Sequence, residues 1–147
     1  MKLAHESHAR VEEFLRQHLG DPGLRLPAFS LYTGRFAWLL MKGLKMGAIT
    51  FGRHIFVSPA LVGRSEDGRA IVPGWLIVHE SVHVLQYERV GYLRFFFEYL
   101  RGYWRALRAS GKWDAAGRME AYLAIAAECD AREAEHAYRR TKEFMDA

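Results

Sequence analysis

Two histidines, four residues apart and with a glutamate between them, lie inside one of the most apolar segments of the chain. The segment Leu76–Leu85 reads Leu-Ile-Val-His-Glu-Ser-Val-His-Val-Leu. Pro73 precedes it, at a position that the first turn of a helix tolerates, and we expect a helix from Pro73 to Arg89. Residues four apart share a helix face and lie about one turn from each other. His79 and His83 should therefore present two imidazoles to one point.

Polar side chains in such an apolar helix cost free energy unless they have partners, and a metal ion supplies them. Zinc accepts imidazole nitrogen readily, and catalytic zinc is commonly held by three protein ligands and a water molecule. Glu80 lies about 100° around the helix from His79, where its carboxylate can act as a base toward that water. The motif therefore predicts a zinc ion (Zn2+) and a metal-dependent hydrolase. The alternative is that His79 and His83 are ordinary polar residues on an exposed stripe.

A third ligand must come from another part of the chain. The long metzincin motif requires Gly and His where this chain has Gln86 and Arg89, which excludes that class. We prefer Glu128, because it follows the apolar run 122–127 and its helical neighbours are mostly small. The simpler interpretation is an ion pair between Glu128 and Arg132, one turn further on. The other candidates are Glu88, Glu98, Glu120, Glu133, Glu135 and His136.

The rest of the pattern predicts an α+β domain that is predominantly helical. Apolar residues at helical spacing predict further helices over 4–19, 35–45, 93–109 and 118–144. β-Branched and aromatic residues predict strands over 24–32 and 48–58, with a turn or bulge at Gly52-Arg53 in the second. Polar loops are expected over 63–68 and 110–117. We expect a single domain over residues 1–147, with a small antiparallel or mixed sheet beside the helices.

The composition is that of a folded globular protein, because half of the 147 residues are hydrophobic. Cys129 is the only cysteine and cannot form an internal disulfide. The start of the chain has no apolar signal segment, and no stretch approaches the roughly 20 apolar residues that span a bilayer. We therefore expect a soluble, cytoplasmic protein. The net charge of +4 is compatible with an anionic partner but does not require one, and no nucleic-acid partner is expected.

The segment 92–105 is dense in aromatic and basic residues. Its apolar residues at helical spacing favour a core helix that covers the motif helix; they are Leu93, Phe96, Phe97, Leu100, Trp104 and Leu107. The alternative is an amphipathic surface for peripheral contact with a membrane, or for a protein partner. Phe95, Tyr99 and Tyr103 lie on another face, where they could line a substrate groove or an oligomer contact.

Three parts of the chain together resemble the gluzincin class of metallopeptidases: the strand 48–52, the motif 79–86 and the segment 128–131. The short length and the order of elements are similar to its minimal members, the minigluzincins. The resemblance covers about residues 48–134. It implies a zincin-like fold, zinc held by His79, His83 and Glu128, and Glu80 as the general base. It also implies that a peptide substrate lies along the edge strand 48–58.

The chain departs from the gluzincin pattern at Arg132. Gluzincins often have Asp or Asn at this position, four residues after the glutamate ligand, where it orients the first histidine. Asp130 or Glu133 are the nearest substitutes for that carboxylate, whose support matters for metal affinity. Candidate donors to an oxyanion are Tyr99, Tyr103, Tyr122, Tyr138 and His136.

The leading hypothesis is thus a zinc metallopeptidase that acts on a peptide or protein substrate. The main alternative is a zincin-fold metal-binding interaction module with weak or no proteolysis, which the small size and Arg132 favour. A third hypothesis is a basic nucleic-acid or membrane binder in which the motif is incidental.

Overall fold

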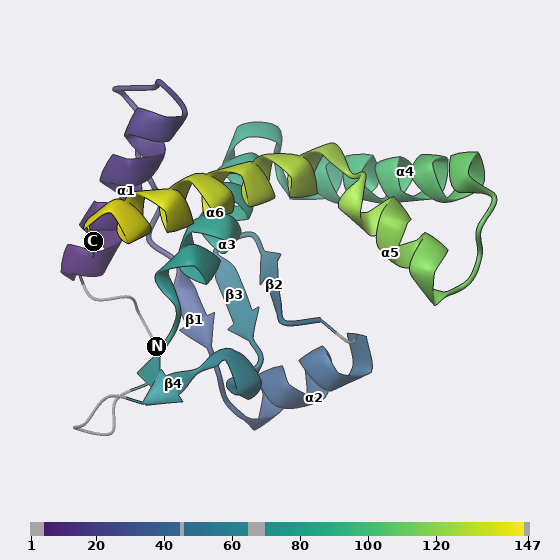
Figure 1. The fold of residues 1–147 in the computed structure, drawn as a ribbon, viewed down its shortest axis with the longest axis horizontal. Helices are drawn as coiled ribbons and strands as arrows, with labels where there is room; N and C mark the ends of the chain where they lie inside the picture. Colours follow the sequence, from purple (N-terminus) through teal and green to yellow (C-terminus); the bar gives the residue numbers. More distant parts are fainter. Residues whose placement is uncertain (1–4, 45, 65–69, 146–147) are drawn as a thin grey trace.

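The computed structural model describes residues 5–44, 46–64 and 70–145 (Figure 1). Its helices are α1 (His5–His18), α2 (Arg35–Leu44), α3 (Gly74–Val90), α4 (Tyr92–Ser110), α5 (Ala115–Leu123) and α6 (Ala126–Met145), with a short 3-10 turn at Pro59–Leu61. Its strands are β1 (Ser30–Tyr32), β2 (Ala48–Phe51), β3 (His54–Val57), β4 (Gly63–Arg64) and β5 (Ala70–Ile71). The described chain is mixed α+β and mostly helical, which confirms the coarse prediction.

The main sheet has the strand order β1-β3-β2, so β2 is an edge strand. β3 pairs with β1 in parallel and with β2 antiparallel, through a tight turn at Gly52-Arg53. Gly52 has a φ of +58°, a left-handed conformation that favours glycine. The predicted strand 48–58 is therefore a hairpin. On the other side of β2 no described strand pairs with it, and its backbone groups there remain free for a further extended chain.

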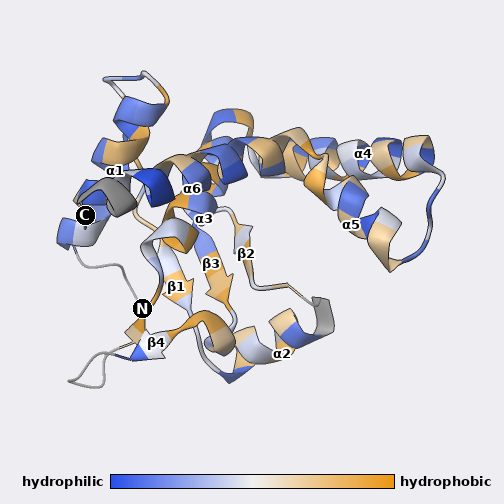
Figure 2. Cartoon of the chain, viewed as in Figure 1, coloured by the Kyte–Doolittle hydropathy of each residue, from blue (hydrophilic) through white to orange (hydrophobic). Residues whose placement is uncertain are grey.

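Helix α3 is the centre of the fold, with β2 on one side of it and α6 on the other (Figure 1). It is apolar around most of its circumference, and such a helix must be covered on all sides. Val78 and Val84 of α3 are fully buried, as are Leu15 of α1 and Ile55 of β3. Figure 2 shows the hydrophobic segments of the strands and of α3 meeting in this core. The motif helix is thus packed into the core of the domain.

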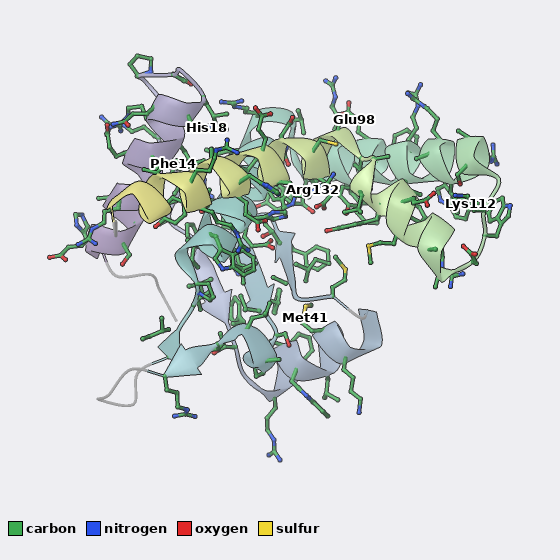
Figure 3. All side chains as sticks on the ribbon, viewed as in Figure 1. Phe14, His18, Met41, Glu98, Lys112 and Arg132 are labelled. Atoms are coloured by element: carbon green, nitrogen blue, oxygen red, sulfur yellow. The ribbon has the colours of Figure 1, made fainter. Side chains whose placement is uncertain are left out.

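The C-terminal segment is two helices, and the predicted single helix over 118–144 is wrong. The helix is interrupted at Ala124-Ile125, between α5 and α6. The Arg132 guanidinium donates hydrogen bonds to the carbonyl oxygens of Leu123 and Glu128, which lie on either side of the break (Figure 3). Arg132 thereby satisfies a carbonyl that the end of α5 leaves without a helical partner.

Two predictions about extended segments also need correction. The predicted strand 24–32 is a strand only over Ser30–Tyr32, and the preceding residues are irregular although Leu24, Leu26 and Phe29 are buried. The predicted loop 63–68 contains β4, which pairs with β5 in a second, two-stranded sheet. Residues 65–69 lie outside the described residues, as do residues 4 and 45 at the ends of two predicted helices.

Helix α4 contacts the motif helix through Phe95, and not through the apolar stripe that was predicted to cover it. Only Phe95 and Leu107 of its apolar residues are buried, whereas Leu93 is 87% exposed and Phe97 67% exposed. α4 and α5 pack on each other and extend away from the body of the molecule as a helical hairpin (Figure 1). Periodicity identified the apolar stripe of α4, but of the six residues in that stripe the described structure buries only Leu107. None of the helices in the described part of the chain combines the length and the apolarity needed to cross a bilayer.

Substitution of Glu12 tests how α1 stabilises the irregular segment before β1. Its carboxylate accepts a hydrogen bond from the backbone N–H of Leu26 at 2.9 Å, and this bond, aided by the charges of Arg16 and Arg25, lowers the pKa of Glu12 below its ordinary value of 4.5. Glu12→Ala should therefore lower the free energy of unfolding by about 1–2 kcal/mol at neutral pH.

Because the folded pKa is depressed, the contribution of Glu12 is present above about pH 4.5 and is lost as the pH falls through the folded pKa. Urea unfolding at a series of pH values should show the wild type and Glu12→Ala converging in acid. Glu13→Ala, next to it on the exposed side of α1, should change stability little. A constant difference at all pH values would contradict the charged hydrogen bond as the cause.

Candidate metal centre

Three side chains converge where α3 crosses the first turn of α6. The Nε2 atoms of His79 and His83 lie 3.5 Å from the two oxygens of the Glu128 carboxylate, one on each. One ligand atom from each residue lies within 4.8 Å of the others. Zinc with nitrogen and oxygen ligands at 2.0–2.2 Å keeps tetrahedral ligands about 3.4 Å apart, so small side-chain adjustments bring the three atoms around one ion. The cluster can hold a metal ion.

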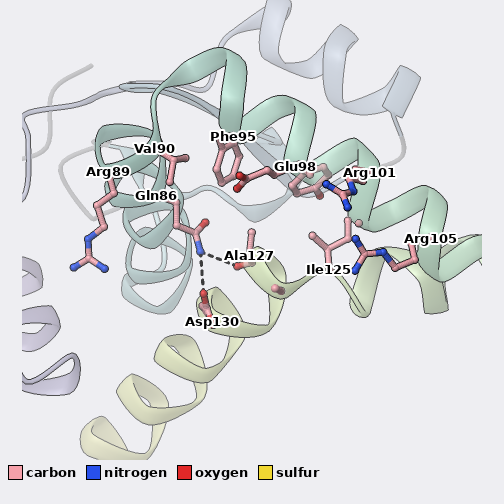
Figure 4. A pocket seen from close by; sticks show the side chains of 13 residues that line it. Gln86, Arg89, Val90, Phe95, Glu98, Arg101, Arg105, Ile125, Ala127 and Asp130 are labelled. Atoms are coloured by element: carbon pink, nitrogen blue, oxygen red, sulfur yellow. Dashed lines mark hydrogen bonds between the residues drawn. The ribbon is translucent and has the colours of Figure 1, made fainter.

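His83 is oriented by Gln86, one turn further along α3. The Nε2 of Gln86 donates to the carbonyl oxygen of Ala127 at 3.2 Å and to Asp130 at 3.4 Å (Figure 4). Both of those partners only accept, which fixes the amide so that its oxygen faces His83. The Nδ1 of His83 must then donate to that oxygen, at 2.8 Å. The lone pair of neutral His83 is therefore on Nε2, directed toward Glu128.

His79 is oriented in the same way by Glu135, two turns after Glu128 on α6. Its Nδ1 lies 3.1 Å from one oxygen of the Glu135 carboxylate. The other oxygen of Glu135 accepts two hydrogen bonds from Arg139. The Nδ1 of His79 donates to the Glu135 carboxylate, which leaves Nε2 of neutral His79 free for the ion. Both imidazoles thus present the same nitrogen to the same point.

The electrostatics of the cluster favour a positive charge. Burial alone would raise the pKa of Glu128, but the two imidazoles and the charge of His83 hold it far below its usual value. Burial alone would lower the pKa of His83, yet Glu128 and Glu80 raise it above its ordinary value. Oε2 of Glu128 is fully buried and has no hydrogen-bond partner among the described residues. An unpartnered carboxylate oxygen beside two imidazole lone pairs fits a divalent cation.

Two phenols approach the same carboxylate from the other helices. Tyr99 of α4 donates its hydroxyl to Oε1 of Glu128 at 2.8 Å. Burial, with the charge of Glu128 added to it, raises the pKa of Tyr99 and of Tyr122 well above the usual range of a phenol. Both remain neutral hydroxyl donors at any physiological pH. Helices α4 and α5 therefore complete the site through their tyrosines.

Glu80 lies next to the cluster but is not part of it. Its side chain is buried, and one oxygen accepts a hydrogen bond from Thr50 of β2 at 2.7 Å. A cavity of about 470 Å3 opens beside the cluster. It is lined by Glu80, by the cluster residues His79, His83 and Glu128, and by the edge strand β2. Thr50 faces α3 because alternate residues of β2 point to the core, and this fixes the rotamer of Glu80.

The structure distinguishes between the candidates for a third ligand. Glu128 is the carboxylate that reaches both imidazoles, and Arg132 bonds its backbone carbonyl rather than its side chain. Three of the other candidates are engaged in surface ion pairs: Glu88 with Arg53, Glu98 with Arg94 and Glu120 with Lys112. Glu133 and His136 are exposed on α6.

The carboxylate that supports His79 was missed by the sequence analysis, which named Asp130 and Glu133 for this role. Asp130 contacts Gln86, and Glu135 contacts His79. Glu135 could have been found from its spacing, because residues seven apart lie two turns apart on one helix face. Gln86 carried a similar signal as the residue one turn after His83.

Comparisons with protein-family profiles, with curated proteins and with solved structures found no match for this chain.

Metal binding should stabilise the fold, because the cluster joins α3 to α6. Adding zinc to metal-free protein at ~100 times its dissociation constant should raise the free energy of unfolding by about 3 kcal/mol. The measurement is thermal unfolding with zinc and with a chelator, together with metal analysis of the purified protein. His83→Ala should abolish the shift, whereas His136→Ala, on the exposed side of α6, should keep it. An equal shift in both variants would place the metal elsewhere.

Glu135→Gln tests the orientation of His79. The amide keeps the size of the side chain but loses the negative charge, and loss of such support typically weakens metal binding about 10- to 100-fold. Glu133→Gln makes the same change of charge at an exposed position on the same helix and should leave affinity unchanged. Competition with a chromophoric chelator measures both. Equal affinities for the two variants would refute the role of Glu135.

Proposed function

We propose that this chain is a zinc metallopeptidase of the gluzincin type, with a zincin-like arrangement of its sheet and motif helix. One observation carries the proposal: the Glu80 carboxylate lies beside the His79–His83–Glu128 cluster, in a cavity that runs along the free edge of β2. Two imidazoles and a carboxylate are the ligand set of many hydrolytic zinc sites. A carboxylate next to that set, but outside it, is what a general base requires.

The chemistry divides between the ion and the side chains of the chain. A zinc ion at the cluster would polarise a water molecule and the scissile carbonyl. Glu80 takes a proton from that water and later delivers it to the leaving amine, so that it ends in its starting state. Thr50 holds one oxygen of Glu80 at 2.7 Å, which leaves the other for this transfer.

Tyr122 is the best placed donor for the oxyanion. It lines the cavity together with Glu80, and Tyr99 already donates its hydroxyl to Glu128. The raised pKa of Tyr122, caused by burial and by Glu128, keeps its proton in place. Tyr103 also lines the cavity, whereas Tyr138 packs against Phe14 of α1 and His136 is exposed.

The shape of the site favours an extended polypeptide as the substrate. A second cavity of about 570 Å3 adjoins the first and shares His79, Glu80 and Tyr122 with it. All four residues of β2 line the first cavity and Ala48 also lines the second, and the free edge of β2 can pair with an added strand. A substrate chain can therefore continue on both sides of Glu80. The first cavity is mostly apolar, with Ile49, Phe51 and Leu100 in its wall, and favours an apolar side chain there.

Glu80→Gln is the decisive variant. It should reduce peptide cleavage by about 10²- to 10⁴-fold, because the amide cannot take up the proton. Zinc content should not change, since Glu80 is not among the ligands. The measurement is mass spectrometry of an unfolded protein substrate after incubation with equal amounts of metal-loaded enzyme.

Glu88→Gln is the control, because it alters a half-exposed glutamate on the same helix that pairs with Arg53 outside the site. It should cleave as the wild type does. Zinc binding without cleavage in the wild type would favour the alternative, a metal-binding interaction module. Cleavage that persists in Glu80→Gln would refute the assigned base.

A further inference from the structure

The outer face of α4 is an apolar ridge that the described structure leaves uncovered. Leu93, Phe97, Leu100 and Trp104 lie within about 60° of one another around the helix. Their exposed fractions are 87%, 67%, 39% and 49%. Folded domains rarely leave so many large apolar side chains exposed together unless the surface binds something. We call these four residues the α4 ridge.

Basic residues border the α4 ridge along one side. Arg94, Arg101, Arg105 and Arg108 also lie within about 60° of one another, about 90° around the helix from the ridge. All four are exposed, and Arg101 and Arg105 project together from α4 in Figure 4. Only Arg94 has an ion pair among the described residues, with Glu98. Arg101, Arg105 and Arg108 therefore offer uncompensated positive charge next to an apolar stripe.

A second helix has the same character. On α2 the exposed residues include Phe36, Trp38 and Leu39, with exposed fractions of 68%, 46% and 61%. Arg35 and Lys42 lie among them, and α2 contains no acidic residue. Phe36 contacts Phe56, which in turn contacts Phe51 at the wall of the cavity. Apolar and basic residues are thus combined twice, on two separate helices.

We propose that the α4 ridge and the exposed face of α2 dock the protein on an anionic membrane surface. Helices with an apolar face bordered by Lys and Arg lie in the interface of a bilayer, with the apolar side chains among the acyl chains and the cations at the headgroups. Trp side chains favour this boundary, and each of the two faces has one, Trp104 on α4 and Trp38 on α2. The charge complementarity selects a bilayer with acidic lipids over a neutral one. Arginine side chains contribute roughly a fivefold gain in partitioning each at such a surface.

Docking places the cavity of the candidate site next to the lipid. Phe96 and Leu100 of α4 and Phe51 of β2 are exposed and also line that cavity. The proposed surface is therefore continuous with the rim of the site. This inference does not depend on the proposed peptidase activity, because docking needs neither zinc nor Glu80.

The test is co-sedimentation of the full chain with vesicles of phosphatidylcholine, alone or mixed with an equal amount of phosphatidylglycerol. The wild type should bind the mixed vesicles, bind the neutral ones far more weakly, and dissociate as salt is raised. Phe97→Glu should abolish binding, whereas Leu19→Glu, at an exposed leucine after α1, should not. Circular dichroism establishes that both variants are folded.

Two double variants distinguish the effect of the local basic patch on vesicle binding from the effect of the net charge of the protein. Arg101→Gln with Arg105→Gln should weaken partitioning roughly 25-fold. Arg10→Gln with Arg25→Gln removes the same charge from exposed positions outside the patch and should leave partitioning close to that of the wild type.

Three outcomes would overturn the proposal. They are equal binding by the two double variants, wild-type affinity of Phe97→Glu, and no vesicle binding by the wild type. If the wild type ignores vesicles and instead forms a dimer that Phe97→Glu disrupts in sedimentation velocity, the ridge is a contact between two copies of the chain. Vesicle binding by Glu80→Gln equal to that of the wild type is expected, and it keeps this test separate from that of the peptidase.

Discussion

The structure depends on the burial of the Glu80 and Glu128 carboxylates beside the imidazoles of His79 and His83, where α3 crosses α6. Ala131 and Ala134 of α6 are fully buried, and such small residues let the two helices approach closely. Only a close approach allows the short side chain of Glu128 to reach both Nε2 atoms. The same approach removes Glu128 from water, which costs free energy unless a positive charge compensates it. The electrostatics of this crossing therefore favour a positive charge, which a metal ion held by His79, His83 and Glu128 could supply.

The part of the site that follows from helical periodicity could be predicted. His79, Glu80 and His83 share one helix, so their relative positions depend only on the helical repeat. Glu128 was identified from its apolar run and small neighbours, which indicate a carboxylate on a packed face. Glu135, Gln86 and Thr50 depend on the rotation of α6 about its axis and on the register of β2 against α3. Neither quantity is encoded in a local pattern, and the candidates named to support His79, Asp130 and Glu133, therefore did not include Glu135.

Two errors in the fold have a common cause. The Ala-rich segment around 121–127 favours a continuous helix by propensity, and it contains neither Gly nor Pro to mark an end. The break at Ala124-Ile125 is instead associated with a distant group, since Arg132 bonds the carbonyl of Leu123 from the next helix. The break separates α5, which packs on α4, from α6, which packs on α3. Likewise, periodicity shows that α4 has an apolar face, but only the tertiary structure shows that most of this face stays exposed.

Helix α4 connects the site to the exposed ridge because one of its faces contacts the site and the opposite face is exposed. On the inner face, Phe95 packs against Tyr87 with ring centroids 4.1 Å apart, and Tyr99 donates to Glu128. On the outer face, Leu93 and Phe97 have no packing role in the described fold. If α4 served only to pack against the rest of the domain, the aromatic residues on its inner face would be sufficient. The excess on the outer face, bordered by arginines, is therefore better explained by an external surface than by the stability of the domain, and the same helix carries both that surface and Tyr99, which contacts Glu128.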